Sequence, residues 1–87
     1  PEYRRQRQMC IRDSLNNVQS ICEAAGYSLD DIVKISIFLT DLSNFGIVND
    51  VMKEYFSEPY PARATVEVSA LPLDVNVEIE AIVLING

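Results

Sequence analysis

The sequence predicts an α+β domain in which a mixed sheet carries two helices on one face. Apolar residues recur at spacings of three and four in residues 13–25 and 44–57, which is the period of an amphipathic helix. They alternate with polar residues in 32–40, 62–70 and 75–85, which is the period of a strand with one covered face. With the order α-β-α-β-β, both helices are expected to pack on the same side of the sheet.

The first predicted helix spans residues 13–25. Gly26 follows it at the position where a helix commonly ends with a left-handed residue. Ser28 can cap the short turn at 28–31. The apolar stripe of this helix consists of Leu15, Val18, Cys22 and Ala25, with Ile21 alongside.

The next strand, 32–40, and the second helix, 44–57, complete the middle of the domain. Asp41 or Ser43 can cap this helix, and Pro59 and Pro61 stop it. One face of the strand is expected to hold Val33, Ile35, Ile37 and Leu39, and the other Ile32, Lys34, Ser36, Phe38 and Thr40. The buried side of the helix is expected to hold Phe45, Val48, Met52, Tyr55 and Phe56.

The last two predicted strands are joined by a tight turn at 71–74, so we expect them to pair as a hairpin. If Leu71 pairs with Asp74, then Arg63 and Glu78 lie four residues apart along the sheet, about 13 Å. That is too far for both to touch one small substrate. Either a substrate–water pair bridges them, or they act in clefts built by different subunits.

The face of the sheet without helices is expected to be both charged and apolar. It is too apolar to face only water and too charged for a plain core, so a second protein surface should cover it. The residues predicted on this face are Arg63, Thr65, Glu67, Asn76, Glu78 and Glu80, with Phe38, Ile82 and Leu84.

Composition bounds the function. The chain has 87 residues, 48% of them hydrophobic, and a net charge of −6, which predicts one globular domain and no nucleic-acid partner for its main body. No apolar run approaches the roughly 20 residues of a membrane span. With no signal-peptide pattern and no disulfide framework, we expect a cytoplasmic protein, or an organellar one in a eukaryote. No histidine is present, so a His-dependent triad and the commonest metal ligand are excluded.

Residues 1–13 differ in charge from the rest. Arg4, Arg5, Arg7 and Arg12 are four of the seven basic residues in the chain. This discontinuity predicts a non-native leader at 1–13, of which 1–7 should pack against nothing, and a domain at 14–87. The alternative is a basic arm that binds nucleic acid.

Several motifs resemble one family. Pro61-Ala62-Arg63, Leu71-Pro72 and Val77-Glu78-Ile79-Glu80-Ala81 are similar to the C-terminal signature of the Rid (YjgF-like) enamine/imine deaminases, and the match continues upstream over residues 14–18, 23–26, 31–34, 41–42 and 45–49. The resemblance implies a chorismate-mutase-like fold, here a fragment lacking the N-terminal strands. It also implies homotrimers with active sites in the clefts between subunits.

The resemblance assigns roles to four residues. Arg63 matches the carboxylate-binding arginine, although its position alone favours an ion pair with a glutamate. Glu78 matches the glutamate that orients or activates water, although Glu80 has the same appearance. Thr65 stands where many members have cysteine, and Asn49 resembles a pocket residue; a plain strand residue and a solvated helix residue are the alternatives.

The implied reaction is hydrolysis of 2-enamine or 2-imine intermediates to 2-ketoacids and ammonia, without cofactor or metal. The implied ligand is a small carboxylate-bearing imine or ketoacid. Because the N-terminal third of the family pattern is missing, the chain as given is expected to be inactive. The alternative is a non-catalytic trimeric protein that binds a small metabolite or a protein partner.

Overall fold

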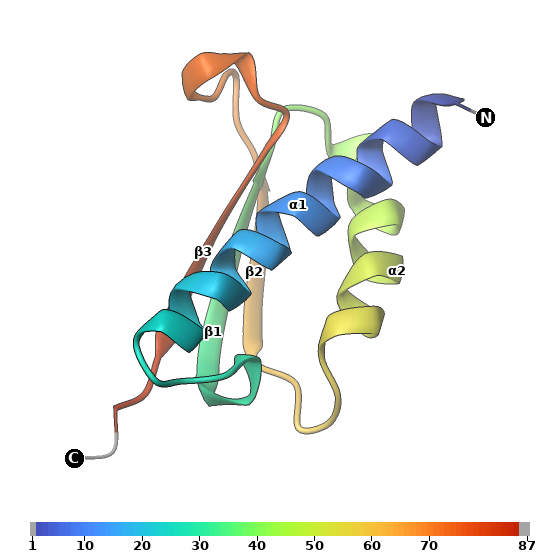
Figure 1. The fold of residues 1–87 in the computed structure, drawn as a ribbon. Helices are drawn as coiled ribbons and strands as arrows, with labels where there is room; N and C mark the ends of the chain where they lie inside the picture. Colours follow the sequence, from blue (N-terminus) through green and yellow to red (C-terminus); the bar gives the residue numbers. More distant parts are fainter. Residues whose placement is uncertain (1, 86–87) are drawn as a thin grey trace.

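The computed structural model describes residues 2–85 and confirms the predicted α+β class. Within that range both helices lie on one side of a three-stranded mixed sheet (Figure 1). No helix of the described residues is long and apolar enough to cross a membrane. The elements are α1 (Glu2–Ala24), β1 (Ile32–Leu39), α2 (Phe45–Tyr55), β2 (Ala62–Glu67) and β3 (Val77–Val83).

The predicted hairpin is wrong, because β1 lies between the two strands that were expected to pair. The strand order is β2-β1-β3, with β2 parallel and β3 antiparallel to β1. Helix α2 carries the chain back so that β2 runs alongside β1, as in other strand–helix–strand units. The connection at 68–76 then passes the end of β1 to reach its other edge (Figure 1). Two backbone hydrogen bonds fix this passage, from Val68 N to Leu39 O (2.8 Å) and from Thr40 N to Asn76 O (3.2 Å).

The core lies between the sheet and the two helices. β1 supplies the most deeply buried strand residues, since Ile35, Ile37 and Leu39 are at most 1% exposed. The start of β1 departs from the predicted alternation: Ile32 is buried, whereas Val33 is 44% exposed. The β1–β3 register shifts between Ile32 and Lys34, and such an irregularity reverses the faces of the residues before it.

Helix α1 begins at Glu2, well before the predicted start at residue 13. Ile11, inside the predicted leader, is 2% exposed and belongs to the core, and Arg4 pairs with Asp50 of α2. The expectation that residues 1–7 pack against nothing is therefore wrong at Arg4. Pro1 lies outside the described residues, and the origin of residues 1–13 stays a prediction.

The end of α1 is as predicted. Gly26 has φ +87°, in the left-handed region where other residues are strained. Tyr27 N donates to Cys22 O (2.8 Å) and Gly26 N donates to Glu23 O (3.0 Å), the two bonds of a Schellman motif. This ending directs the chain from α1 toward β1.

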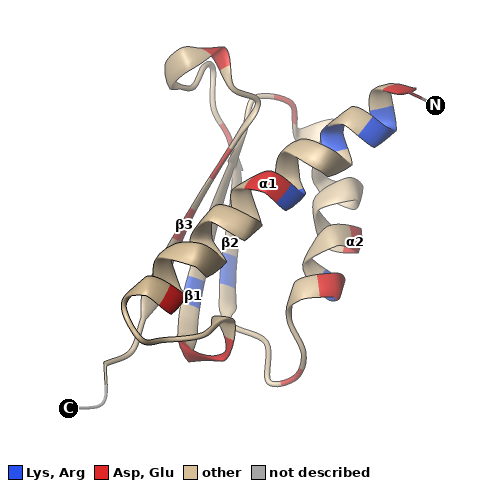
Figure 2. Ribbon diagram, viewed as in Figure 1, with Lys and Arg blue, Asp and Glu red and all other residues tan. Residues whose placement is uncertain are grey.

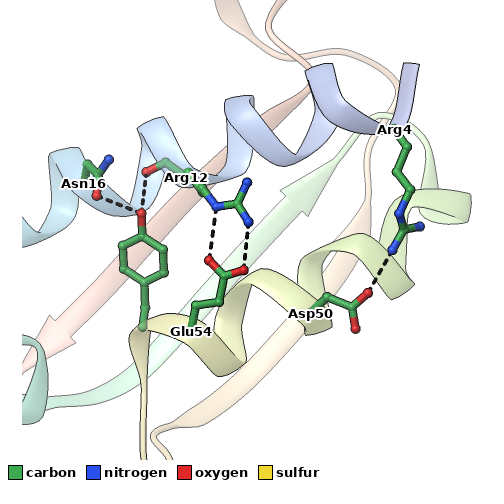
Figure 3. A network of polar contacts seen from close by, with 6 residues as sticks. Arg4, Arg12, Asn16, Asp50 and Glu54 are labelled. Atoms are coloured by element: carbon green, nitrogen blue, oxygen red, sulfur yellow. Dashed lines mark hydrogen bonds and ion pairs between the residues drawn. The ribbon is translucent and has the colours of Figure 1, made fainter. Parts of the chain in front are cut away.

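Charged and polar side chains join α1 to α2 (Figure 3). Arg12 donates to both carboxylate oxygens of Glu54, at 3.1 and 2.7 Å. The hydroxyl of Tyr55 donates to Asn16 Oδ1 at 2.8 Å. Tyr55 thus contacts α1 at the edge of the core, whereas the sequence placed it on the buried side of α2.

The Arg12–Glu54 pair predicts a pH-dependent contribution to stability. The hydrogen bond from Arg12 lowers the pKa of the Glu54 carboxyl in the folded chain. A lowered folded pKa means that this stabilisation is present above the unfolded pKa and is lost as the pH falls through the folded pKa. We expect Glu54→Gln to lower the Tm slightly at pH 7, with the difference from wild type disappearing in acid. Thermal melts across pH 2–7 measure this difference in Tm.

Glu23→Gln is the control, since Glu23 has no side-chain partner within residues 2–85. A Tm difference that is independent of pH would contradict the prediction.

Candidate functional site

Helix α2 presents three different faces. Its core face contains Ile47, Val48, Val51 and Met52, all buried. A second face carries the acidic residues that pair with α1. The third face is a stripe formed by Phe45, Asn49 and Lys53, which are spaced by four residues and therefore lie one above another.

The side chains of Arg63 and Thr65 point from β2 toward the helix side of the sheet. Arg63 is paired with Ile35 and Thr65 with Ile37 in the β1–β2 register. Paired residues share a face of a sheet, and both partners on β1 are buried beneath the helices. The prediction that Arg63, Thr65 and Glu67 lie on the helix-free face is therefore wrong. Alternation correctly separated the two faces of β2 but did not reveal which one is turned toward α2.

Arg63 meets the stripe on α2 directly. Its guanidinium carbon lies 5.3 Å from the centroid of the Phe45 ring, which is a cation–π distance. The ion pairs of residues 2–85 do not include Arg63, so the glutamate pair favoured by its position is not formed there. The guanidinium is therefore oriented by an aromatic ring and retains its capacity to bind a carboxylate.

A cavity of about 220 Å³ lies between α2, the segment after it and the start of β2. It is smaller than the roughly 300–1,000 Å³ of pockets that hold drug-sized ligands, so its size suits a small metabolite. Two predicted site residues, Arg63 and Asn49, line it. The remaining lining residues are Met52, Lys53, Phe56, Tyr60 and Pro61.

Thr65 has an unused hydrogen-bonding group. Its Oγ1 atom is buried and has no hydrogen-bond partner within residues 2–85. Buried hydroxyl groups are normally paired, so an unpaired one marks a position where water or a ligand completes the bonding. Thr65 stands one pleat repeat beyond Arg63 on the same face of β2, next to the cavity-lining arginine.

Glu78 lies elsewhere. It is paired with Phe38 of β1, on the face that no described helix covers, and it is exposed. The basic segment of β2 and the acidic segments of β3 lie on opposite edges of the sheet (Figure 2). One chain therefore keeps Arg63 and Glu78 apart, on opposite faces and with β1 between them. The predicted separation of about 13 Å was derived from the hairpin register, and that derivation no longer applies.

Sequence reasoning missed Phe45 and Lys53 as members of this site. Phe45 was assigned to the buried side of α2, but it is 40% exposed and stacks on Arg63. Lys53 received no role. The spacing of four that links both to Asn49 was the available signal. Within residues 2–85, no group of three or more His, Cys, Asp or Glu side chains is arranged to hold a metal ion.

The chain is similar in sequence to known proteins. The family described as endoribonuclease L-PSP matches residues 5–85, a match that begins inside the predicted leader. The chain is 45% identical over 80 residues to the 2-iminobutanoate/2-iminopropanoate deaminase of Dermatophagoides farinae, covering 87% of this chain and 62% of the relative.

Solved structures share the fold. RidA from the Antarctic bacterium Psychrobacter sp. has a TM-score of 0.77 at 56% identity, covering 79% of this chain and 56% of that one. TdcF from E. coli with bound serine has a TM-score of 0.82 at 47% identity, covering 87% of this chain and 62% of that one. The chain thus spans between 56% and 62% of the length of these relatives.

Proposed function

Because this chain belongs to the Rid (YjgF-like) family, we propose that it forms part of an enzyme that hydrolyses 2-enamine and 2-imine compounds to 2-ketoacids and ammonia. The observation that supports this best is the environment of Arg63. Its guanidinium is stacked on Phe45, has no ion-pair partner within residues 2–85, and lines a cavity of metabolite size with Asn49. A carboxylate on the substrate is the group that this arginine is suited to bind.

Arg63 would hold the substrate carboxylate through two parallel N–H···O bonds, because the planar guanidinium matches a carboxylate in geometry. Asn49 and the unpaired hydroxyl of Thr65 supply further hydrogen-bonding groups beside it. These contacts would orient the C=N carbon, and orientation by itself lowers the barrier of a reaction with water.

Glu78 would be the base. It takes a proton from water while the water oxygen bonds to the imine carbon and the C=N π electrons move to nitrogen, and it returns that proton to the nitrogen. In the resulting carbinolamine Glu78 passes the hydroxyl proton to the amino nitrogen, so that ammonia leaves as the C–N bond breaks and the C=O bond forms. Since Arg63 and Glu78 lie on opposite faces of one chain, we propose that each site combines Arg63, Asn49 and Thr65 of one subunit with Glu78 of another.

The helix-free face supports assembly into a homotrimer. Val66 is 43% exposed on it and lies beside Phe38 of β1, and Ile82 is 57% exposed on the same face of β3, opposite Lys34. Apolar side chains gathered on one face indicate an interaction surface. Closed cyclic symmetry would let each copy cover another and bring Glu78 to a neighbour.

We expect a trimer by light scattering, and we expect Ile82→Glu to shift it toward monomer. Leu73→Glu is the matched control, because Leu73 is 96% exposed in the turn before β3. A wild-type protein that is monomeric at micromolar concentration, or a trimer unaffected by Ile82→Glu, would contradict the proposed assembly.

The alternative is a non-catalytic trimer that binds a small metabolite or a protein partner. A coupled assay for ketoacid release from freshly generated 2-iminobutanoate, performed on the product of the complete gene, separates the two. Turnover supports the enzyme, whereas binding of 2-ketobutyrate without turnover supports the alternative. We do not propose RNA cleavage, because thirteen acidic residues against seven basic ones oppose binding to phosphates, and histidine is absent.

A further inference from the structure

Two cationic side chains line the cavity. Arg63 approaches from β2 and Lys53 from α2. Within residues 2–85 neither forms an ion pair, whereas Arg4 and Arg12 are each paired with an acidic residue of α2. The cavity is therefore lined by two positive charges without counter-charges, in a chain whose net charge is −6.

The two charges come from separate places along the cavity. Lys53 lies eight residues after Phe45 on the same stripe of α2, about 12 Å along the helix axis at 1.5 Å per residue. Arg63 reaches the Phe45 end of this stripe, where its guanidinium lies over the aromatic ring. Side chains leave a helix tilted toward its N-terminus, so the stem of Lys53 is expected to tilt toward Asn49. Met52 and Phe56 provide apolar surface on the same cavity.

We propose that the cavity selects a dianionic substrate, a 2-imino acid that carries a second carboxylate at the far end of a short methylene chain. This inference rests on the proposed function. Arg63 holds the carboxylate next to the reacting carbon, the apolar residues contact the methylenes, and Lys53 holds the distal carboxylate. Lysine suits this last role because its ammonium is a compact charge on a flexible stem.

An uncharged substrate tail would fit less well. It would displace water from the Lys53 ammonium without providing a counter-charge, and desolvating an unpaired charge is unfavourable. The competing explanation is that Lys53 only interacts favourably with the C-terminal end of the α2 dipole. That role would be insensitive to which ligand is bound, so ligand preference distinguishes the two explanations.

Calorimetric titration with two 2-oxo acids tests the inference. 2-Oxoglutarate carries the second carboxylate, and 5-methyl-2-oxohexanoate carries an isopropyl group in its place. We expect wild type to prefer 2-oxoglutarate by about three- to fivefold, as a partly solvated charge pair allows. Lys53→Gln should remove this preference. Arg5→Gln is the matched control, because Arg5 is exposed on α1 and does not line the cavity, and it should keep the preference.

Each titration result bears on either the inference about Lys53 or the proposed function. Equal binding of the two acids by wild type, or an unchanged preference in Lys53→Gln, overturns the inference and leaves the proposed function standing. Failure of wild type to bind either 2-oxo acid overturns the proposed function together with the inference. Loss of preference in Arg5→Gln as well would show a general charge effect and would also overturn the role of Lys53.

Discussion

Arg63→Lys should remove most of the imine-hydrolysis activity, although the charge is kept. Lysine cannot form two parallel hydrogen bonds to a carboxylate, and it lacks the planar group that stacks on Phe45. Both losses free the substrate to move. Displacing a reacting group by about 1 Å can cost on the order of a hundredfold in rate, so we expect a fall in kcat/KM of about that size.

Steady-state kinetics with 2-iminobutanoate and titration with 2-ketobutyrate measure this effect. Arg12→Lys is the matched control, because Arg12 pairs with Glu54 on the α1 side of α2 and lies outside the cavity. It should retain wild-type kinetics. If Arg63→Lys keeps near-wild-type turnover, Arg63 is not the carboxylate clamp, and the binding-protein alternative gains support.

Glu78→Gln should separate binding from chemistry. The amide keeps the shape of the side chain but cannot accept a proton from water, so kcat should fall by about 10²–10⁴-fold while 2-ketobutyrate still binds. This pattern differs from Arg63→Lys, which should weaken binding as well. The same two measurements therefore distinguish a base from a clamp.

Glu80→Gln decides between the two glutamates that the sequence could not tell apart. Glu80 lies one pleat repeat from Glu78 on the same exposed face of β3. We expect Glu80→Gln to keep most of the activity. Full activity in Glu78→Gln would show that the base has been assigned to the wrong residue.

The sequence predicted the elements better than their pairing. The spacing of hydrophobic residues along the sequence identified both helices and all three strands, because burial of one face of an element imposes that spacing locally. It contains no information about which strand edges meet. The two strands adjacent in sequence were therefore expected to pair, whereas both pair with β1, which has two edges and the most deeply buried residues.

The prediction of which individual side chains are buried failed for identifiable reasons. Val33 and Ile32 exchanged their expected faces, because the register shift beside them is a backbone irregularity that composition does not reveal. Arg63 was placed on the wrong side of the sheet, because a charged side chain was assumed to avoid the helices. Because β2 is an edge strand, Arg63 can face α2 and still be exposed. A residue that binds a ligand needs such exposure.

The candidate site was predicted in part. Arg63 and Asn49 were identified through the resemblance, and the structure places both on one cavity. Phe45 and Lys53 were missed, since Phe45 at helical spacing was interpreted as core and Lys53 was given no role. Glu78 could not be positioned from the sequence, because its relation to Arg63 depends on strand order and on neighbouring copies.

Complementation between two inactive variants tests the central claim most directly, namely that each site is shared between subunits. Arg63→Lys and Glu78→Gln chains are co-expressed, and imine hydrolysis by the mixed assemblies is measured. If the residues act across a subunit boundary, a site is intact when one variant supplies its Arg63 and the other its Glu78, so random mixing restores about one quarter of the sites.

The control replaces the Glu78→Gln chain with the double variant Arg63→Lys/Glu78→Gln, which supplies no intact arginine and should restore nothing. Activity near one quarter of wild type is the predicted result. A mixture no more active than the control would contradict the shared site.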